Sequence, residues 1–378
     1  MKGFRYLSWW LMILFLTGCM GVKETQVDIP TILPDNIPIT NSTKSSPTII
    51  PTATSTKSPW SADPDPLQID VMRQQSYPGS QIIIEQTLEQ GTNYNRYIVS
   101  YISDGHKIYS LMTIPSEEKP ENGWPVIIFN HGYIEPSEYR TTERYVAYVD
   151  AIARHGYIVF KPDYRGHGNS EGGEVIGGGY GTPGYTNDIL NAITSLKAYP
   201  DVDPNRIGMW GHSMGGQITL RAMVVSKDIK AGVIWGGVVT SYPEIIARWD
   251  YKKNPGLFPE MVISELSDQK SSTGNWLSDF SGWVAKFSAK YGEPGQNPDF
   301  WATISPNSYL TDLSGPIQLH HSTTDEMVPL AWSETLAQEL QLAGESYEFY
   351  TYEGDNHNIS ANFCVAMQRT VEFFDSYV

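Results

Sequence analysis

The chain has 378 residues, and its 26 Lys and Arg against 42 Asp and Glu give it a net charge of -16. Hydrophobic residues make up 40% and charged residues 18%, which is typical of a globular protein and excludes a disordered or collagen-like chain. Excess negative charge without a basic block repels phosphate backbones, so we expect no nucleic-acid partner. The two cysteines, Cys19 and Cys364, are too few for a disulfide framework or a thiolate metal site.

The first residues are typical of an export signal. Lys2 and Arg5 precede an apolar run over residues 7–16, which is shorter than the ~20 residues that span a bilayer. The run ends in Leu-Thr-Gly-Cys, which resembles the bacterial lipobox, whose cysteine is acylated and becomes the mature N-terminus. We therefore predict a lipoprotein signal peptide over 1–18, lipidation of Cys19 and an extracytoplasmic protein anchored to a bacterial membrane. An ordinary secretory signal is the alternative.

The following segment is unlike either the signal or the rest of the chain. Residues 23–66 contain 8 Pro and 14 Ser or Thr in 44 positions, with no helical or alternating apolar pattern. We predict that residues 19–66 comprise the lipidated cysteine and a Pro/Ser/Thr-rich tether. At ~3.1 Å per residue an extended tether reaches on the order of 130 Å, enough to hold a domain clear of a membrane.

Residues 67–378 alternate between short apolar runs and helical periods. Two leading strands, 81–89 and 97–114, are expected to be antiparallel, with a turn at Ser103-Asp104-Gly105 in the second. Six buried strands are expected at 126–129, 158–160, 207–210, 233–235, 317–319 and 347–352. Helical periods separate several of them, so the pattern predicts a mostly parallel sheet covered by helices on both faces.

One stretch interrupts this alternation. Residues 241–300 show no strand pattern, yet 10 of these 60 residues are aromatic. A structureless loop of that length is improbable in a compact domain, so we predict a helical insertion. Because it follows one strand and precedes the next, it is expected to form a lid over the carboxyl ends of the strands. The alternative is a packing layer remote from any site.

A nucleophile motif follows the strand at 207–210. Gly211-His212-Ser213-Met214-Gly215 fits the pattern G-x-S-x-G and precedes a helical run, as a nucleophile elbow requires. A serine hydroxyl needs a base and an orienting acid. Asp325 follows the strand at 317–319, and His357 lies in the loop after the strand at 347–352. Three strand ends of one parallel sheet would therefore bring Ser213, Asp325 and His357 together.

The sequence resembles the α/β-hydrolase superfamily, and within it the prolyl oligopeptidase catalytic domain and its dienelactone-hydrolase-like relatives. The resemblance covers about residues 96–378 apart from the predicted lid. Its motifs are Ser103-Asp104-Gly105, Asn130 to Tyr133, Asp163 to Gly168, the elbow at Ser213, Asp325 with Val328-Pro329, and Gly354 to His357.

The resemblance implies a second donor for the oxyanion of an acyl-transfer intermediate. The N–H of Met214 follows the nucleophile and is the first donor that we expect. By resemblance, the N–H of Tyr133 is the second. We predict a serine hydrolase that cleaves ester or short peptide bonds through an acyl-enzyme, without a metal or organic cofactor.

Two alternatives remain open at this point. A carboxylesterase acting on small or plant-derived esters would suit the aromatic lid, and Met214 stands where many peptidases have an aromatic residue. A tethered ligand-binding protein on an inactive hydrolase scaffold is the alternative of another class. His320 and His321 point to opposite faces of a strand, so we predict packing roles rather than metal ligation. We also expect Cys364 to be buried.

Overall fold

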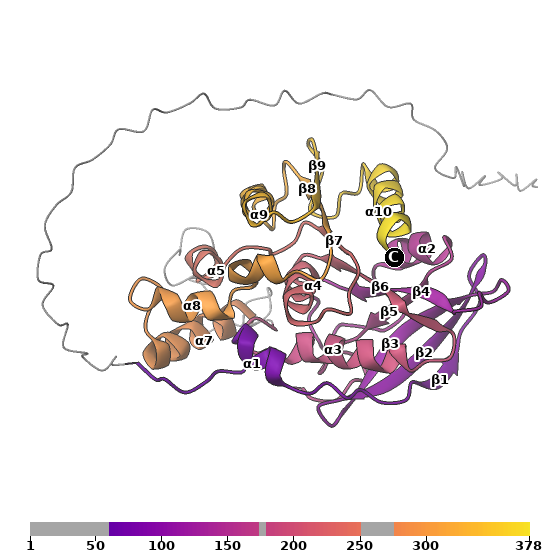
Figure 1. Ribbon diagram of the computed structural model, residues 1–378, viewed down its shortest axis with the longest axis horizontal. Helices are drawn as coiled ribbons and strands as arrows, with labels where there is room; N and C mark the ends of the chain where they lie inside the picture. Colours follow the sequence, from indigo (N-terminus) through magenta and orange to yellow (C-terminus); the bar gives the residue numbers. More distant parts are fainter. Residues whose placement is uncertain (1–59, 174–178, 251–275) are drawn as a thin grey trace, which may run out of the picture. The chain divides into compact units, whose positions relative to one another are not determined.

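A nine-stranded sheet forms the centre of the protein in the computed structural model, which describes residues 60–173, 179–250 and 276–378 (Figure 1). Its strands are β1 (Ile83–Thr87), β2 (Tyr94–Ser103), β3 (His106–Pro115), β4 (Trp124–Asn130), β5 (Ile158–Pro162), β6 (Val202–His212), β7 (Gly232–Trp235), β8 (Ile317–Ser322) and β9 (Tyr347–Tyr352). Every predicted strand is therefore confirmed, and the turn predicted at Ser103-Asp104-Gly105 joins β2 to β3.

The strand order across the sheet is β1-β2-β3-β5-β4-β6-β7-β8-β9. The first three strands are antiparallel to one another, and β3 is also antiparallel to β5. All pairs from β5 to β9 are parallel. β4 is buried along its whole length, as expected for a strand in the middle of a parallel sheet. The carboxyl ends of β6, β7, β8 and β9 therefore meet at one edge.

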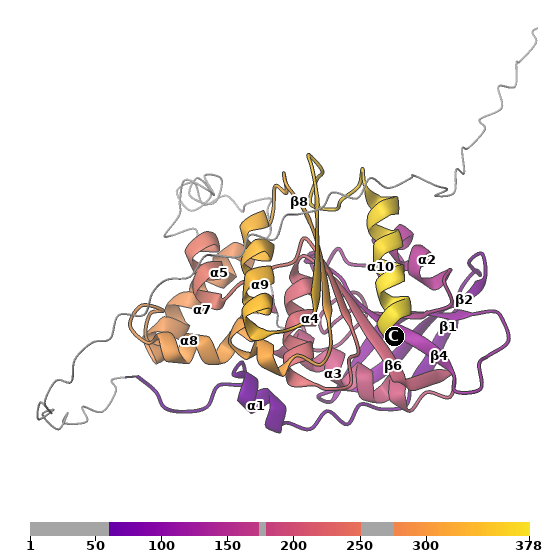
Figure 2. The ribbon, with the colours of Figure 1, turned by 45° about the horizontal axis from the view of Figure 1, so that its top comes forward.

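Helices cover both faces of the sheet. α2 (Val146–Ala153) and α10 (Phe363–Tyr377) pack together on one face, whereas α3 (Gly184–Lys197), α4 (Met214–Val225) and α9 (Leu330–Ala343) lie on the other (Figure 2). Each layer has its own apolar cluster, one including Ile152 with Phe374 and the other Ile189 with Leu336. The predicted α/β-hydrolase architecture is confirmed.

The described part of the predicted lid is helical. It comprises α5 (Tyr242–Trp249), α7 (Trp276–Tyr291) and α8 (Pro298–Ile304), followed by the 3-10 helix η3 (Pro306–Asp312). α5 contacts α7 and α8, and these three helices lie together in Figure 1 beside α4. Residues 251–275 lie outside the described residues, so a lid role remains a prediction.

The N-terminal predictions fall largely outside the described part. The signal peptide at 1–18, Cys19 and most of the tether lie there, whereas residues 60–66 are described and belong with the catalytic body in one unit, Ser58–Val378. Asp65 accepts a hydrogen bond from the Tyr291 hydroxyl at 3.0 Å, and the Ser61 N–H donates to the Lys290 carbonyl at 3.0 Å. The last part of the predicted tether thus packs on α7. No helix among the residues described is long and apolar enough to cross a membrane.

α1 (Ile69–Gln74) continues this N-terminal contact along the body, and it packs against α4 and α8.

Cys364 lies near the start of α10 and is exposed. The prediction that Cys364 is buried is therefore wrong. The apolar stripe of α10 instead runs through Met367, Val371 and Phe374.

Candidate active site

Ser213 occupies a strained turn between β6 and α4. Its φ is 56° and its ψ is -120°, a conformation that residues with a side chain rarely adopt. The turn is fixed by three backbone hydrogen bonds: Ser213 N–H donates to the Trp235 carbonyl at 3.0 Å, while its own carbonyl accepts from Gly216 and Val238 at 2.9 and 3.0 Å. Strain of this kind persists only where the surroundings enforce it, and it places the Ser213 side chain in the pocket.

Glycine is needed where α4 approaches β4. A Cβ on Gly215 would lie 1.9 Å from the Asn130 carbonyl oxygen, a distance that no rotamer change could relieve. Gly215 therefore lets the first turn of α4 pack directly on the end of β4. The pattern G-x-S-x-G predicted this elbow, and the structure shows why the second glycine of the pattern has to lack a side chain.

Asp325 and His357 lie together at the same sheet edge. The His357 Nδ1 and the Asp325 Oδ2 are 2.7 Å apart, and the Asp325 side chain is fully buried. Gly236, just beyond β7, packs against both: a Cβ there would be 3.1 Å from each of these two atoms. Because the carboxylate can only accept, the His357 Nδ1 carries the proton and its Nε2 is left as an acceptor.

The Asp325 carboxylate is held by more than His357. Its Oδ1 accepts the N–H groups of Met327 and Val328, both at 2.8 Å, and its Oδ2 lies 3.3 Å from the His321 Nε2. Burial alone would raise the pKa of Asp325, but hydrogen bonds from His321, His357 and Val328 outweigh it and hold the pKa well below its usual range. The carboxylate is therefore ionised throughout the neutral range.

His321 is the site residue that sequence reasoning missed. The sequence predicted packing roles for His320 and His321, and His320 does pack among Trp235 and Tyr352. His321 instead contacts Asp325, with its Nδ1 2.7 Å from the Ser333 hydroxyl and its Nε2 3.0 Å from the Val328 carbonyl. The only sequence signal for this contact was that His321 lies four residues before Asp325, and that spacing does not show which way the His321 side chain points.

The loop that carries His357 is organised by a second acid. Asp355 accepts hydrogen bonds from the backbone N–H groups of Asn356, Ala361 and Asn362 at 2.8 to 3.1 Å. The His357 N–H in turn donates to the Glu326 carboxylate at 3.1 Å. Both acids thus hold the loops around His357, whereas Asp325 alone of the three hydrogen-bonds its ring.

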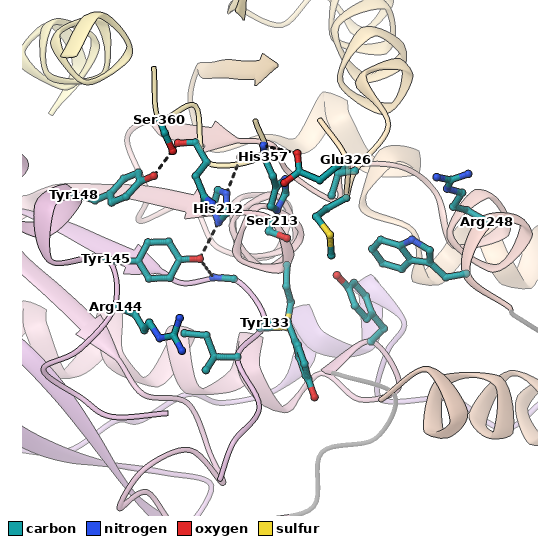
Figure 3. Close-up of a pocket in the computed structure, with 18 residues that line it drawn as sticks. Tyr133, Arg144, Tyr145, Tyr148, His212, Ser213, Arg248, Glu326, His357 and Ser360 are labelled. Carbon is teal, nitrogen blue, oxygen red and sulfur yellow. Dashed lines mark hydrogen bonds between the residues drawn. The ribbon is translucent and has the colours of Figure 1, made fainter. Parts of the chain in front are cut away.

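A pocket of about 610 Å³ opens over Ser213 and His357 (Figure 3). Its apolar wall includes Tyr180, Trp249 and Met327, and in Figure 3 Ser213 and His357 lie near the centre of the group of lining residues. This volume is in the range of sites that bind small organic ligands. Trp249 comes from α5, so the predicted lid region does contribute one wall of the pocket.

The two residues predicted to carry the oxyanion donors, Met214 and Tyr133, line the pocket together with Ser213. The Met214 N–H begins α4 and therefore has no acceptor within the helix. Across the pocket, a Cβ on Gly132 would lie 3.1 Å from the Ser213 Cβ and 2.7 Å from the Tyr145 hydroxyl. The loop with Gly132 and Tyr133 thus runs directly beside the nucleophile, and a side chain at position 132 would displace the Tyr145 hydroxyl.

A buried hydrogen-bond chain joins this loop to the His357 loop. The Gly132 N–H donates to the Tyr145 hydroxyl at 3.0 Å, the hydroxyl lies 2.8 Å from the His212 Nδ1, and the His212 Nε2 lies 3.1 Å from the His357 carbonyl. Burial lowers the pKa of His212 to about 3, so its ring is neutral. The carbonyl can only accept, so Nε2 carries the proton and Tyr145 donates to Nδ1.

Beneath the same loop lies a second buried polar group. Lys161 donates to the Glu143 carbonyl at 3.2 Å and lies over the Tyr139 ring. Burial lowers the pKa of Lys161 to about 8 and raises that of Asp163, which accepts from Thr141, to about 6. These contacts tie the segment after Tyr133 to β5. Nearby, Arg165 has a structural role, because it pairs with the buried Asp188 at 2.7 Å.

Comparisons with known proteins match this chain to peptidases and esterases. The family model described as serine aminopeptidase, S33, matches residues 124–281, and that of the prolyl oligopeptidase family matches residues 269–378. The uncharacterized peptidase YtmA of Bacillus subtilis is 22% identical over 69% of this chain and 85% of its own. The putative esterase YitV of the same organism is 24% identical over 70% and 94%.

A solved structure shows the same fold. The acetyl xylan esterase from Paenibacillus sp. R4 superposes with a TM-score of 0.57 at 16% identity, covering 82% of this chain and 92% of that one. The chain is a serine hydrolase of the α/β-hydrolase fold. Its resemblance to the prolyl oligopeptidase family is supported over the carboxyl-terminal part of the hydrolase, from residue 269 to 378.

Within residues 60–173, 179–250 and 276–378, no group of three or more His, Cys, Asp or Glu side chains is arranged to hold a metal ion. Of the predicted site residues, Ser213, Met214, Tyr133 and His357 line one pocket, and Asp325 lies directly behind His357. Cys19 lies outside the described residues.

Proposed function

We propose that the protein cleaves acyl bonds with Ser213 as nucleophile, His357 as general base and acid, and Asp325 as the group that orients His357. The Ser213 oxygen attacks the acyl carbon while its proton passes to the His357 Nε2. His357 then protonates the leaving group, and an acyl-enzyme remains. Water, deprotonated by the same nitrogen, attacks the acyl carbon and releases the acid, which restores the Ser213 hydroxyl.

One observation carries this proposal. His357 donates from Nδ1 to a buried carboxylate at 2.7 Å, and it lines the same pocket as a serine held at a φ of 56°. The pair fixes the ring tautomer with Nε2 free to accept a proton, which is the state that a general base requires. An inactive binding scaffold would have no need of either feature.

The oxyanion of the tetrahedral intermediate would be bound by the N–H groups of Met214 and Tyr133. The Met214 donor benefits from its place at the start of α4, where the helix dipole is positive. Gly132 lets the second strand-to-helix loop come close enough to Ser213 for this role. Loss of one such donor typically lowers turnover by about 10²-fold to 10³-fold.

The test of this function is active-site labelling of the full-length protein. A fluorophosphonate probe should label wild type at Ser213, and the variant S213A should lose both labelling and hydrolysis while keeping its circular dichroism spectrum. S226A, at the other end of α4, is the matched control and should be labelled like wild type. Hydrolysis that persists in S213A would refute the proposal.

Within this function, the pocket favours esters over peptides with a free amino terminus. An amino terminus is a cation and needs a carboxylate partner. Among the described residues that line the pocket, Glu326 is the only carboxylate, and its Oε2 already accepts the His357 N–H. We therefore propose ester cleavage as the main activity, with blocked or short peptides as the second candidate.

A direct comparison separates the two substrate classes. We expect kcat/KM for 4-nitrophenyl acyl esters to exceed that for aminoacyl 4-nitroanilides by more than about a hundredfold. An intrinsic difference in ester and amide reactivity contributes, so an acylated aminoacyl anilide serves as the control for the free amino group. Faster cleavage of the free anilide than of the blocked one, together with slow ester cleavage, would favour an aminopeptidase.

We further propose that the enzyme is an extracytoplasmic lipoprotein anchored through Cys19. The support is the sequence alone: the charged start, the short apolar run and the Leu-Thr-Gly-Cys of residues 16–19. Metabolic labelling with an alkynyl fatty acid should mark wild type and not C19A. If C19A fractionates with the membrane as wild type does, the anchor lies elsewhere.

A further inference from the structure

The charges around the pocket differ from those of the chain as a whole. The chain carries a net charge of -16, yet the charged side chains among the described pocket residues, His357 aside, are two arginines and one glutamate. Arg144 and Arg248 supply the two positive charges, and Glu326 supplies the negative one. A locally cationic pocket in an acidic protein attracts anions and repels cations.

Arg248 is the cation with the more enclosed position. It lies in the last turn of α5, next to Trp249, and its Nε is buried without a hydrogen-bond partner among the described residues. In Figure 3 its guanidinium extends from α5 toward the side of the pocket that carries Glu326. Because buried polar groups are nearly always paired, an unpaired buried N–H lining a pocket indicates a missing acceptor.

The nearby acids in the described part of the chain do not supply that acceptor. Glu244, one turn earlier on α5, is exposed, and Asp250 accepts from the Ser281 hydroxyl at 2.9 Å. Glu326 is engaged with the His357 N–H. The ion pairs within the described part of the chain do not include Arg248. Its guanidinium is therefore available to a ligand.

We propose that Arg248 binds a carboxylate of the substrate, so that the enzyme prefers acyl esters that carry a negative charge. This inference rests on the proposed function and names the substrate class of the same site. A guanidinium binds a carboxylate through two parallel N–H···O bonds. The buried Tyr180 and Trp249 line the same pocket as Arg248, and an apolar environment strengthens such a charged pair.

Arg144 adds positive charge at the opposite side of the pocket. It is exposed, and Figure 3 shows it beside Tyr145, across the pocket from Arg248. Both Arg144 and Tyr145 have positive φ values, 56° and 52°. Because an exposed cation is largely screened by water and salt, we assign Arg144 a role in attracting the anion and Arg248 the role of binding it.

The experiment compares matched charged and neutral substrates on the full-length protein. In the first pair, 4-nitrophenyl hydrogen glutarate and 4-nitrophenyl valerate have acyl chains of equal carbon count, and only the former has a carboxylate. In the second pair, 4-carboxyphenyl butyrate and its methyl ester place the charge on the leaving group. The variants are R248Q and R248K, with R154Q as the control, since Arg154 pairs with Asp150 on the exposed side of α2.

We expect R248Q to lower kcat/KM for the charged member of at least one pair by about 10-fold to 100-fold, the range for losing a charge-assisted hydrogen-bonded pair. The neutral member should change by less than about threefold. R248K should fall between wild type and R248Q, because lysine keeps the charge and loses the bidentate geometry. R154Q should match wild type on all four esters. An equal loss on charged and neutral esters in both pairs would overturn the inference.

A binding measurement separates this inference from the proposed function. Glutarate should quench tryptophan fluorescence through Trp249 in wild type and in S213A, whereas valeramide of the same chain length should not. Quenching by glutarate that R248Q leaves unchanged would refute the role of Arg248. If S213A still hydrolyses valerate esters, the proposed function is wrong. The glutarate binding measurement is independent of that result, because it tests only the role of Arg248.

Discussion

Replacing Asp325 with asparagine should inactivate the enzyme by changing the tautomer of His357. The Asp325 Oδ1 accepts two backbone N–H groups, from Met327 and Val328, both at 2.8 Å. The asparagine carbonyl oxygen must take this place, because its NH₂ group would face two donors. The NH₂ group is then directed at the His357 Nδ1, which lies 2.7 Å from the atom that it replaces.

The size of the effect follows from this geometry. His357 can keep a hydrogen bond to the new NH₂ group only by moving its proton from Nδ1 to Nε2. A protonated Nε2 cannot accept the Ser213 proton, so kcat should fall by about 10⁴-fold, equivalent to about 5 kcal/mol of transition-state stabilisation. Substrate contacts are unchanged, so KM should stay within about threefold.

The assay is steady-state hydrolysis of 4-nitrophenyl valerate by full-length D325N, with stopped-flow measurement of the acylation burst. D228N is the matched control, because Asp228 forms an exposed pair with Lys197 and should leave the rate unchanged. Circular dichroism and thermal melting establish that D325N is folded. If folded D325N retains more than a tenth of the wild-type kcat, the assignment of Asp325 is wrong.

Three further predictions concern residues around the Asp325–His357 pair. Y145F leaves the Gly132 N–H and the His212 Nδ1 unpaired, so kcat should fall about tenfold and the free energy of unfolding by about 1 to 3 kcal/mol. If neither quantity changes, the hydrogen bonds from Tyr145 to Gly132 and His212 are dispensable. G236A puts a methyl group 3.1 Å from both partners of the Asp325–His357 pair, and we expect kcat to drop by about 10²-fold at nearly constant KM, as stopped-flow acylation will show. Burial lowers the pKa of Lys161 from 10.5 to about 8, so between these pH values the folded state binds fewer protons than the unfolded state and wild type gains stability as pH rises. K161M lacks this dependence, and at pH 7 its free energy of unfolding in urea should exceed that of wild type by about 1 to 3 kcal/mol. This difference in unfolding free energy should shrink toward pH 10. A difference that does not change with pH would contradict a charged Lys161 at neutrality.

The sequence predicted the fold because its signals are local. Short continuous apolar runs such as 126–129 and 158–160 are typical of strands buried on both faces, and the helical periods between strands indicate parallel crossovers. The elbow was also predictable, since a strand, two glycines around a serine and a helix occur within a few residues of one another. Boundaries differed by a few residues: β6 begins at Val202 rather than 207.

The triad order was predictable for a related reason. In a parallel sheet every carboxyl end lies at one edge, so Ser213, Asp325 and His357 could be assigned to one edge from their positions after strands. Their separation along the chain did not matter, because topology alone determines which ends meet. The structure adds the 2.7 Å contact and the burial that set the charge of Asp325.

The sequence by itself determined the order of strands and helices, the nucleophile turn and the edge at which the acid and the base would meet, because these follow from neighbouring residues and from the direction of the chain. Only the tertiary structure decided that His321 touches Asp325, that Tyr145 and His212 connect two loops, and that Arg248 lines the pocket with its Nε unpaired among the described residues. Those contacts join segments far apart in the chain, and their existence depends on side-chain direction and burial, for which sequence spacing carries no information.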